Sequence, residues 1–403
     1  MKMITKFSLY GFLKNLDFSE PFLILFYLSL GLNFLQIGIL VAFLNICINI
    51  LEIPSGAVAD IYGRKNCMIV SLSSYIISFI IFALSNSYPP LFIALSFYAI
   101  GESFRSGTHK AMIFDWLRLN DRLSEKTKVY GFTRSWSKYG SAVAVIISTL
   151  IVIFTDGYRW IFIFSIIPDV FGLWNLATYP KYLNKKLIDK IDFTFVFKHT
   201  FGIVKSSLKN FNLRKLIIQS TGFEGVFEVT KDYLQPILKA QALVLAVYFT
   251  LSEKDSTAII VGIVYFILYL ISAVASRKAH VFAGKFKSEQ AAITAMLFLG
   301  FILIFLSSFG IYTKLYLIAI LSYISFYIIQ NIWGPIIVAQ YDNYAGSSEQ
   351  ATILSIESQT KTLGIIIFAP LAGYLADNYG IESALLMLSF IILLVGVYSL
   401  KKM

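Results

Sequence analysis

The chain has 403 residues, of which 57% are hydrophobic, 16% aromatic and only 14% charged, and its formal net charge is +11. A mean hydropathy of +0.73 over this length excludes a water-soluble globular domain and predicts an integral membrane protein. The basic excess alone would suit a nucleic-acid partner, but the placement of the bases along the chain argues against one.

Apolar runs follow one another along nearly the whole chain, each of about 20 residues, which is enough for one helical crossing of a bilayer. They are too long for barrel strands, so the sequence predicts an all-α integral membrane bundle. The first run carries Lys14, Asp17 and Glu20 and lacks the layout of a cleaved signal peptide, so we expect a retained helix. Twelve transmembrane helices are predicted, at about residues 6–30, 36–59, 67–85, 90–116, 130–154, 159–180, 216–244, 257–276, 290–309, 314–341, 352–376 and 381–399.

The Lys and Arg residues are unevenly placed between these runs. Most of the 34 lie in the two tails and in alternate loops, and the densest group is in residues 181–215. The remaining loops contain or adjoin Arg159, Lys254 and Lys314. This asymmetry is the positive-inside pattern. It predicts a multi-pass protein of the inner (cytoplasmic) membrane with both termini in the cytoplasm, and it accounts for the basic excess without nucleic acid.

The chain contains an internal repeat. "DFSEPFL" (Asp17–Leu23) recurs as "DYLQPIL" (Asp232–Leu238), and "GTHKAMIFD" is followed at a similar offset by "GPIIVAQYD". We therefore expect two pseudo-symmetric six-helix halves, residues 1–180 and 216–403, joined by a basic cytoplasmic linker at 181–215. Two parallel six-helix halves clamped around a midplane site are a transporter architecture that works by alternating access.

The stretch "LEIPSGAVADIYGRK" ends the second predicted helix with the pattern G-x-x-x-D-x-x-G-R-K. It resembles the signature of the major facilitator superfamily, G-x-x-x-D-(R/K)-x-G-R-(R/K), and the resemblance extends over the whole chain. Ile61 departs from this signature, which has a base there. The preceding "EIPSG" resembles a bacterial subgroup of expected exporters. The motif residues are Gly56, Asp60, Gly63, Arg64 and Lys65.

The residue types and spacing of this motif predict that it forms a gate. Gly56 would let two helices approach closely, and Gly63 permits a tight cytoplasmic turn. Asp60 is placed to meet the positive end of a helix that starts near residue 352, and Arg64 can pair with Asp115. We expect this latch to hold an outward-open state. The alternative is a simple stop-transfer turn with snorkelling bases.

Charges within the apolar runs are candidates for function because each costs about 2.5 to 3.5 kcal/mol at the centre of a bilayer on insertion scales. The family resemblance implies that helices 1, 4, 7 and 10 line the cavity, and most of these charges fall there. Structural ion pairs are the alternative for any single residue. The proton-coupling or substrate candidates are Asp17, Glu20, Glu52, Glu102, Arg105, Glu224, Glu228 and Asp232, and the possible cavity residues are Gln330, Asn331 and Trp333.

A carboxyl group flanked by apolar surface can load and release a proton, so we expect Glu228, Asp17 and Glu224 to couple transport to protons and Glu102 and Arg105 to contact the substrate. The predicted function is secondary active transport of a small molecule, as proton-coupled efflux of amphipathic or cationic compounds because acids outnumber bases among the candidates. A proton-coupled symporter that imports a metabolite and a non-transporting membrane sensor are the alternatives.

The sequence gives no sign of an enzyme, since it has no nucleophile and base cluster, phosphate-binding loop or metal-ligand spacing. Cys47 and Cys67 form no framework. We expect no cofactor and no metal, with a transmembrane proton or ion gradient as the energy source. The expected partners are the small-molecule substrate and the lipid bilayer, and the chain is expected to be a monomer.

Overall fold

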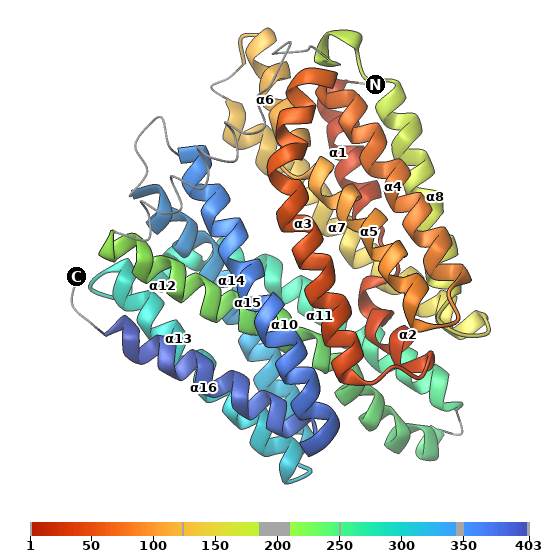
Figure 1. Cartoon of the computed structure of the whole chain (residues 1–403), viewed down its shortest axis with the longest axis vertical. Helices are drawn as coiled ribbons and strands as arrows, with labels where there is room; N and C mark the ends of the chain where they lie inside the picture. The colour runs from red at the N-terminus through yellow and green to blue at the C-terminus, as the bar shows by residue number, and fades with distance from the viewer. Residues whose placement is uncertain (1, 123–124, 185–209, 250, 344–349, 401–403) are drawn as a thin grey trace. The chain divides into compact units, whose positions relative to one another are not determined.

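The computed structural model describes residues 2–122, 125–184, 210–249, 251–343 and 350–400. Over these residues the regular structure is helical and contains no strand (Figure 1). Most of the linker predicted at 181–215 therefore lies outside the described residues. The chain divides into a first unit, Met1–Leu30, Ile46–Phe197 and Val261–Phe266, and a second unit, Gly31–Asn45, Lys198–Ile260 and Ile267–Met403. The predicted halves 1–180 and 216–403 stay a prediction.

In the first unit, α4 packs against α5 and α8, and α1 packs against α7 and α8. The helix α3 starts in the second unit and ends in the first. The elements of this part of the chain are α1 (Met3–Lys14), η1 (Glu20–Phe22), α2 (Leu23–Ser29), α3 (Phe34–Tyr62), α4 (Arg64–Leu84), α5 (Tyr88–Arg105), α6 (Thr108–Leu119), α7 (Lys126–Phe154), α8 (Trp160–Ala177) and η3 (Lys181–Asn184).

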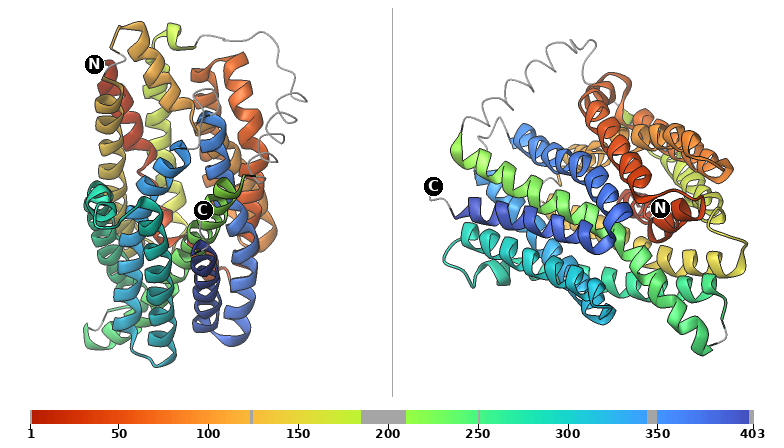
Figure 2. Two further views of the ribbon diagram at one scale, coloured as in Figure 1. Left: turned by 90° about the vertical axis from the view of Figure 1, so that its left-hand side faces the viewer. Right: turned by 60° about the horizontal axis from the view of Figure 1, so that its bottom comes forward.

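In the second unit, α13 packs against α14 and α16, and α10 packs against α15, and Figure 2 shows these helices from two further sides. The helix α11 contributes one short segment, Val261–Phe266, to the first unit. The elements of this part are α10 (Phe211–Phe249), α11 (Glu253–Arg277), α12 (Ala279–Ala283), α13 (Glu289–Tyr312), α14 (Tyr316–Asn343), α15 (Gln350–Tyr379) and α16 (Ile381–Ser399).

Each predicted run corresponds to helical structure, but the count of twelve transmembrane helices is not confirmed. Within the described residues, eight helices are long and apolar enough to cross a membrane. They lie in α3, α4, α7, α8, α11, α13, α14 and α16.

Two predicted runs, 6–30 and 90–116, are not continuous helices. The first stops at Lys14, and Asp17 then accepts a hydrogen bond from the backbone N–H of Ser19 at 2.9 Å, which satisfies the chain before the short helix η1 begins. The second stops at Arg105, because Gly107 has a φ of +71° and starts α6 in a new direction. Within a bilayer, non-helical backbone is tolerated where it is buried in protein or lines a cavity.

The close contact of α1 with α7 positions the site that follows. A Cβ atom on Gly140 of α7 would lie 2.4 Å from the carbonyl oxygen of Phe12, and one on Gly11 of α1 would lie 2.8 Å from Oγ of Ser137. Only glycine permits this approach, so two small residues bring the polar side chains of α1 and α7 together.

Candidate functional site

The G-x-x-x-D-x-x-G-R-K motif ties the start of α4 to two other parts of the first unit. Gly63 caps α4 with a φ of +91°, a left-handed conformation that glycine adopts without strain. Arg64 forms an ion pair with Asp115 of α6, the pairing expected from the sequence. Nζ of Lys65 donates to the carbonyl oxygens of Ala177 and Tyr179, each at 2.9 Å.

Two other motif positions differ from the expectation or are not described. A Cβ atom on Gly56 would meet no atom within 4 Å, so the close helix approach expected there is absent from the described structure. The side chain of Asp60 and the residues around position 352 lie outside the described side chains, so the predicted contact of Asp60 with a helix N-terminus stays a prediction.

A cluster of charges lies where α1, α4 and α5 meet. Glu102 accepts a hydrogen bond from Nη2 of Arg105 at 2.6 Å and another from the hydroxyl of Tyr75. Nζ of Lys14 lies 3.8 Å from the Glu102 carboxylate and 4.2 Å from the centre of the Tyr75 ring. Only 11% of the Lys14 side chain and 23% of the Glu102 side chain are exposed. A buried carboxylate with two bases and a phenol as partners is compensated, whereas loss of the carboxylate would leave the two bases without this partner.

The other acids predicted as site residues in this unit lie in or next to breaks between helices. Asp17 also accepts from the hydroxyl of Ser19 at 2.5 Å, which makes it the capping residue of the break after α1. Glu20 lies exposed at the start of η1. Glu52 of α3 accepts from the hydroxyl of Ser106 at 3.3 Å, next to the break between α5 and α6.

In the second unit, the indole N–H of Trp333 donates to Glu224 at 3.1 Å, and the Trp333 ring stacks on Phe223 with centroids 4.1 Å apart. Trp333 is fully buried, so it contacts Glu224 within the packed bundle rather than lining an open cavity. Glu228 pairs with Lys231 on the same helix at 2.5 Å, with about a third of each side chain exposed.

The other predicted residues of this unit are more dispersed. Asp232 is half-buried on α10, and Gln330 is half-buried on α14. The amide of Asn331 donates to the hydroxyl of Ser272 on α11 at 3.0 Å. The structure therefore links α10 to α14 through Glu224, and α14 to α11 through Asn331.

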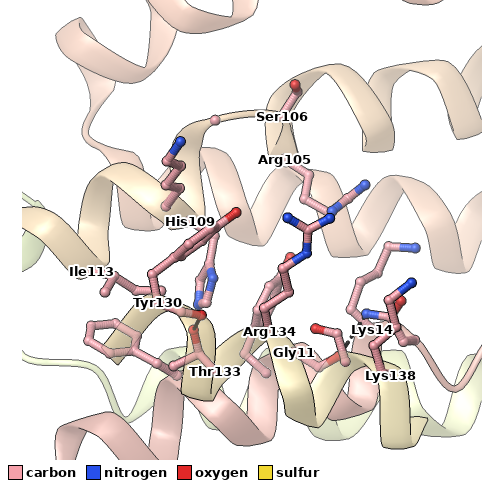
Figure 3. A pocket seen from close by; sticks show the side chains of 16 residues that line it. Gly11, Lys14, Arg105, Ser106, His109, Ile113, Tyr130, Thr133, Arg134 and Lys138 are labelled. Carbon is pink, nitrogen blue, oxygen red and sulfur yellow. Dashed lines mark hydrogen bonds between the residues drawn. The ribbon is translucent and has the colours of Figure 1, made fainter. Parts of the chain in front are cut away.

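A cavity of about 450 Å³ lies within the first unit, between α1, the α5–α6 break and α7 (Figure 3). Arg105 is the one predicted site residue on its wall. The other side chains on that wall that carry a full positive charge are Lys14, Lys110, Arg134 and Lys138. These four were not among the site residues chosen from the sequence. Arg134 and Lys138 stand four residues apart, a spacing that predicts one helical face in an otherwise apolar run.

Aromatic groups complete the wall. His109 of α6 lies over Tyr10 of α1 with ring centroids 4.1 Å apart, and both line the cavity. The hydroxyl of Tyr179, just beyond α8, donates to the carbonyl oxygen of Lys6 at 3.2 Å. These contacts fix the start of α1 against α6 and α8.

Asp169 of α8 is a further buried acid that the sequence reasoning missed. It is 5% exposed, follows Pro168 inside the helix, and interacts electrostatically with Lys14 and Tyr10 of α1. A Pro-Asp pair in the apolar run 159–180 is the signal that could have identified it, because an acid at that depth is costly in lipid.

Comparison with known proteins agrees with this arrangement. The family model of the Major Facilitator Superfamily matches residues 12–358. The chain belongs to the Major Facilitator Superfamily. Members with this match are transporters, so the chain is a transporter of a small molecule and not an enzyme. The finer assignment to the subgroup suggested by "EIPSG" stays a prediction.

Individual proteins of the superfamily are similar along nearly their whole length. An uncharacterized MFS-type transporter, YxaM of Bacillus subtilis (strain 168), is 23% identical over 399 residues, covering 93% of this chain and 89% of that protein. The crystal structure of the nucleoside transporter NupG has a TM-score of 0.80 at 13% identity and covers 100% of both chains. A D-xylose-proton symporter has a TM-score of 0.70 at 15% identity, covering 99% of this chain and 97% of that one. At these identities the solved structures support the fold alone.

Proposed function

We propose that this superfamily member is a proton-coupled secondary transporter that exports a small solute by alternating access. The observation that carries the proposal is the cluster of Lys14, Glu102 and Arg105 inside an apolar bundle. Charges at that depth are costly, and in membrane proteins they mark substrate and ion pathways. The basic tails and loops support a cytoplasmic location of both termini in a bacterial inner membrane.

Proton coupling is assigned to the acids of α10 and to Asp17, with Glu228 as the first candidate. Glu228 pairs with Lys231 and both side chains are about a third exposed, so protonation of the carboxylate would release the lysine. Glu224 accepts a hydrogen bond from the indole N–H of Trp333. A proton that moves down a potential of 100 mV supplies about 2.3 kcal/mol, enough to bias such a pair.

The second part of the proposal concerns the motif at the α3–α4 turn, the latch predicted from the sequence. The ion pair of Arg64 with Asp115 and the two hydrogen bonds of Lys65 support a rigid connection at the α3–α4 turn. We assign to this connection, together with Asp60, the stabilisation of the outward-open state. Asp60→Asn is expected to slow transport while substrate binding persists.

The count of acids favoured amphipathic or cationic compounds, and of these we propose an amphipathic solute without net positive charge. The wall of the described cavity is basic, which favours the opposite charge. Import by proton symport is the second candidate, because one solved structure with the same fold is a D-xylose-proton symporter.

The test uses inside-out membrane vesicles with an imposed proton gradient, followed by a pH-sensitive dye while anionic, neutral and cationic solutes are added. Export by antiport predicts that one class dissipates the gradient and that Glu228→Gln abolishes the effect. Glu253→Gln is the matched control, because Glu253 also pairs with a lysine, Lys239 at 3.3 Å, but at the start of α11 with half of its side chain exposed.

Import would instead appear as proton-driven uptake of the solute into right-side-out vesicles. If the Glu228→Gln variant dissipates the proton gradient as the unchanged protein does, Glu228 takes no part in proton coupling. Absence of solute movement in both vesicle orientations would contradict the proposed function.

A further inference from the structure

We propose that the cavity of the first unit binds the anionic group, a carboxylate or phosphate, of a soluble solute. This inference rests on the proposed transport function and names the charge of the solute. Among the described residues that line this cavity there is no Asp or Glu.

The positive charge of the wall is only partly compensated. Outside the wall, Glu102 is shared by Lys14 and Arg105, and Asp169 also interacts with Lys14. Lys110 lies over the rings of Phe114 and Tyr130, at 5.7 and 5.3 Å, which leaves its full charge in place.

Within the described part of the chain, Arg134 and Lys138 of α7 make no ion pair at contact distance, although Lys138 interacts electrostatically with Glu20 outside the wall. Figure 3 shows the side chains of Arg105, Arg134, Lys14 and Lys138 directed toward the same space. Like charges that share a cavity repel one another, and an anion placed between them would relieve the repulsion. Guanidinium groups are suited to this task because they can hold a carboxylate or phosphate by two parallel hydrogen bonds.

A second, independent observation points to a ligand. The hydroxyl of Tyr10 is buried and has no hydrogen-bond partner in the described structure, although Tyr10 lines the cavity and only 3% of the residue is exposed. A buried hydroxyl without a partner is destabilising unless something supplies an acceptor. Because this hydroxyl is also closed to solvent, an anionic oxygen in the cavity would become its acceptor only with a small shift of the wall on binding.

The size of the cavity and its shape favour a small organic anion over a bare ion. About 450 Å³ exceeds the volume of a single phosphate, and small drug-like ligand sites begin at about 300 Å³. The rings of Phe7, Tyr10, His109 and Tyr130 offer apolar surface beside the charges. The solute is therefore expected to combine an anionic head with an apolar or aromatic body.

The binding test is independent of transport. Purified full-length protein in nanodiscs of neutral phosphatidylcholine is titrated calorimetrically at low chloride with benzoate, and with the matched neutral benzamide and cationic benzylamine. Citrate tests a larger negative charge, and inorganic phosphate tests a smaller anion. We expect benzoate to bind at least about tenfold more tightly than benzamide and benzylamine to show no binding.

The variants assign the charge preference to this cavity. Arg134→Gln and Lys138→Gln are each expected to weaken anion binding about tenfold or more, as is typical when a hydrogen bond to a charged group is lost. The control Lys278→Gln removes an exposed base at the end of α11 and should leave binding unchanged. Tyr10→Phe should weaken binding without lowering the midpoint of thermal unfolding, because it removes a hydroxyl that has no partner in the described structure.

Equal binding of the three benzene derivatives, or anion binding that all of these variants retain, would overturn the inference. Nanodiscs with increasing phosphatidylglycerol separate a solute from a lipid headgroup: an unchanged benzoate affinity supports a solute site, and progressive loss of binding would assign the cavity to lipid instead. Charge-selective binding without any transport would contradict the proposed function alone, and transport without charge-selective binding would contradict this inference alone.

Discussion

Asp377, near the end of α15, is expected to tether the start of α3 within the second unit. Its two carboxylate oxygens accept hydrogen bonds from the backbone N–H groups of Phe34 and Leu35, both at 2.8 Å. These are the first two residues of α3, whose amides have no partner inside the helix, and the positive end of the helix dipole adds to the attraction. The perturbation is Asp377→Ala.

The surrounding packing shows how closely the two helices are held. A Cβ atom on Gly373 of α15 would lie 2.3 Å from the carbonyl oxygen of Phe34, and one on Gly38 of α3 would lie 2.4 Å from that of Ala369. Loss of a helix cap costs about 0.5 to 2 kcal/mol and loss of a charge at a helix start about 0.3 to 1 kcal/mol. Since Asp377 is exposed, we expect a total of about 1 to 2 kcal/mol, which corresponds to a fall of about 1 to 3 °C in the unfolding midpoint.

The assay combines thermal unfolding with a distance measurement. Spin labels at residues 39 and 374, both exposed, report the separation of α3 and α15 in a background without native cysteines. Asp377→Ala should lower the unfolding midpoint and broaden the distance distribution, because one of the contacts between the helices is lost.

Asn33→Ala provides the matched control. Oδ1 of Asn33 accepts from the N–H of Gln36 at 2.8 Å, and Oε1 of Gln36 accepts from the N–H of Asn33 at 3.0 Å, so this pair caps the same helix end locally. Its loss should lower stability by a similar amount without changing the distance distribution. If Asp377→Ala leaves both stability and distance unchanged, the assignment of a tether to Asp377 is wrong.

Three further variants test the packing and the polar contacts. Gly140→Val should destabilise the protein by about 1 to 3 kcal/mol in thermal unfolding, since its Cβ would lie 2.4 Å from a carbonyl oxygen, whereas Gly131→Val on the same helix enters open space and should cost much less. Gly63→Ala is expected to cost at least about 1 to 2 kcal/mol, because its φ is positive and its Cβ would also lie 2.8 Å from the carbonyl oxygen of Asn184, and unchanged stability would show that the turn relaxes. Trp333→Phe keeps the ring stack but removes the donor to Glu224, so a loss of about 1.5 to 3 kcal/mol is expected, and an unaltered unfolding midpoint would mean that another donor replaces it.

The positions of the membrane helices could be predicted from the sequence because each lipid-embedded segment must itself be composed mostly of apolar residues. Each run of apolar residues between charged loops became helical structure, and the superfamily followed from the motif around Gly63 and Arg64. The pairing of Arg64 with Asp115 was also predictable, since both charges lie at helix ends that the motif brings together, although Asp115 also pairs with Arg118 of its own helix at 3.3 Å.

What only the tertiary structure decided is where helices stop inside an apolar run and which side chains then share a cavity. Composition could not reveal that Gly107 turns the chain between α5 and α6, because a glycine is compatible with a continuous helix until packing selects its positive φ. The wall that joins Tyr10 to Arg134 depends on the close contact of α1 with α7, which two glycines permit and which no local pattern reports. Local chemistry determines the helices, whereas the charge of the cavity is a sum over helices that are distant in sequence.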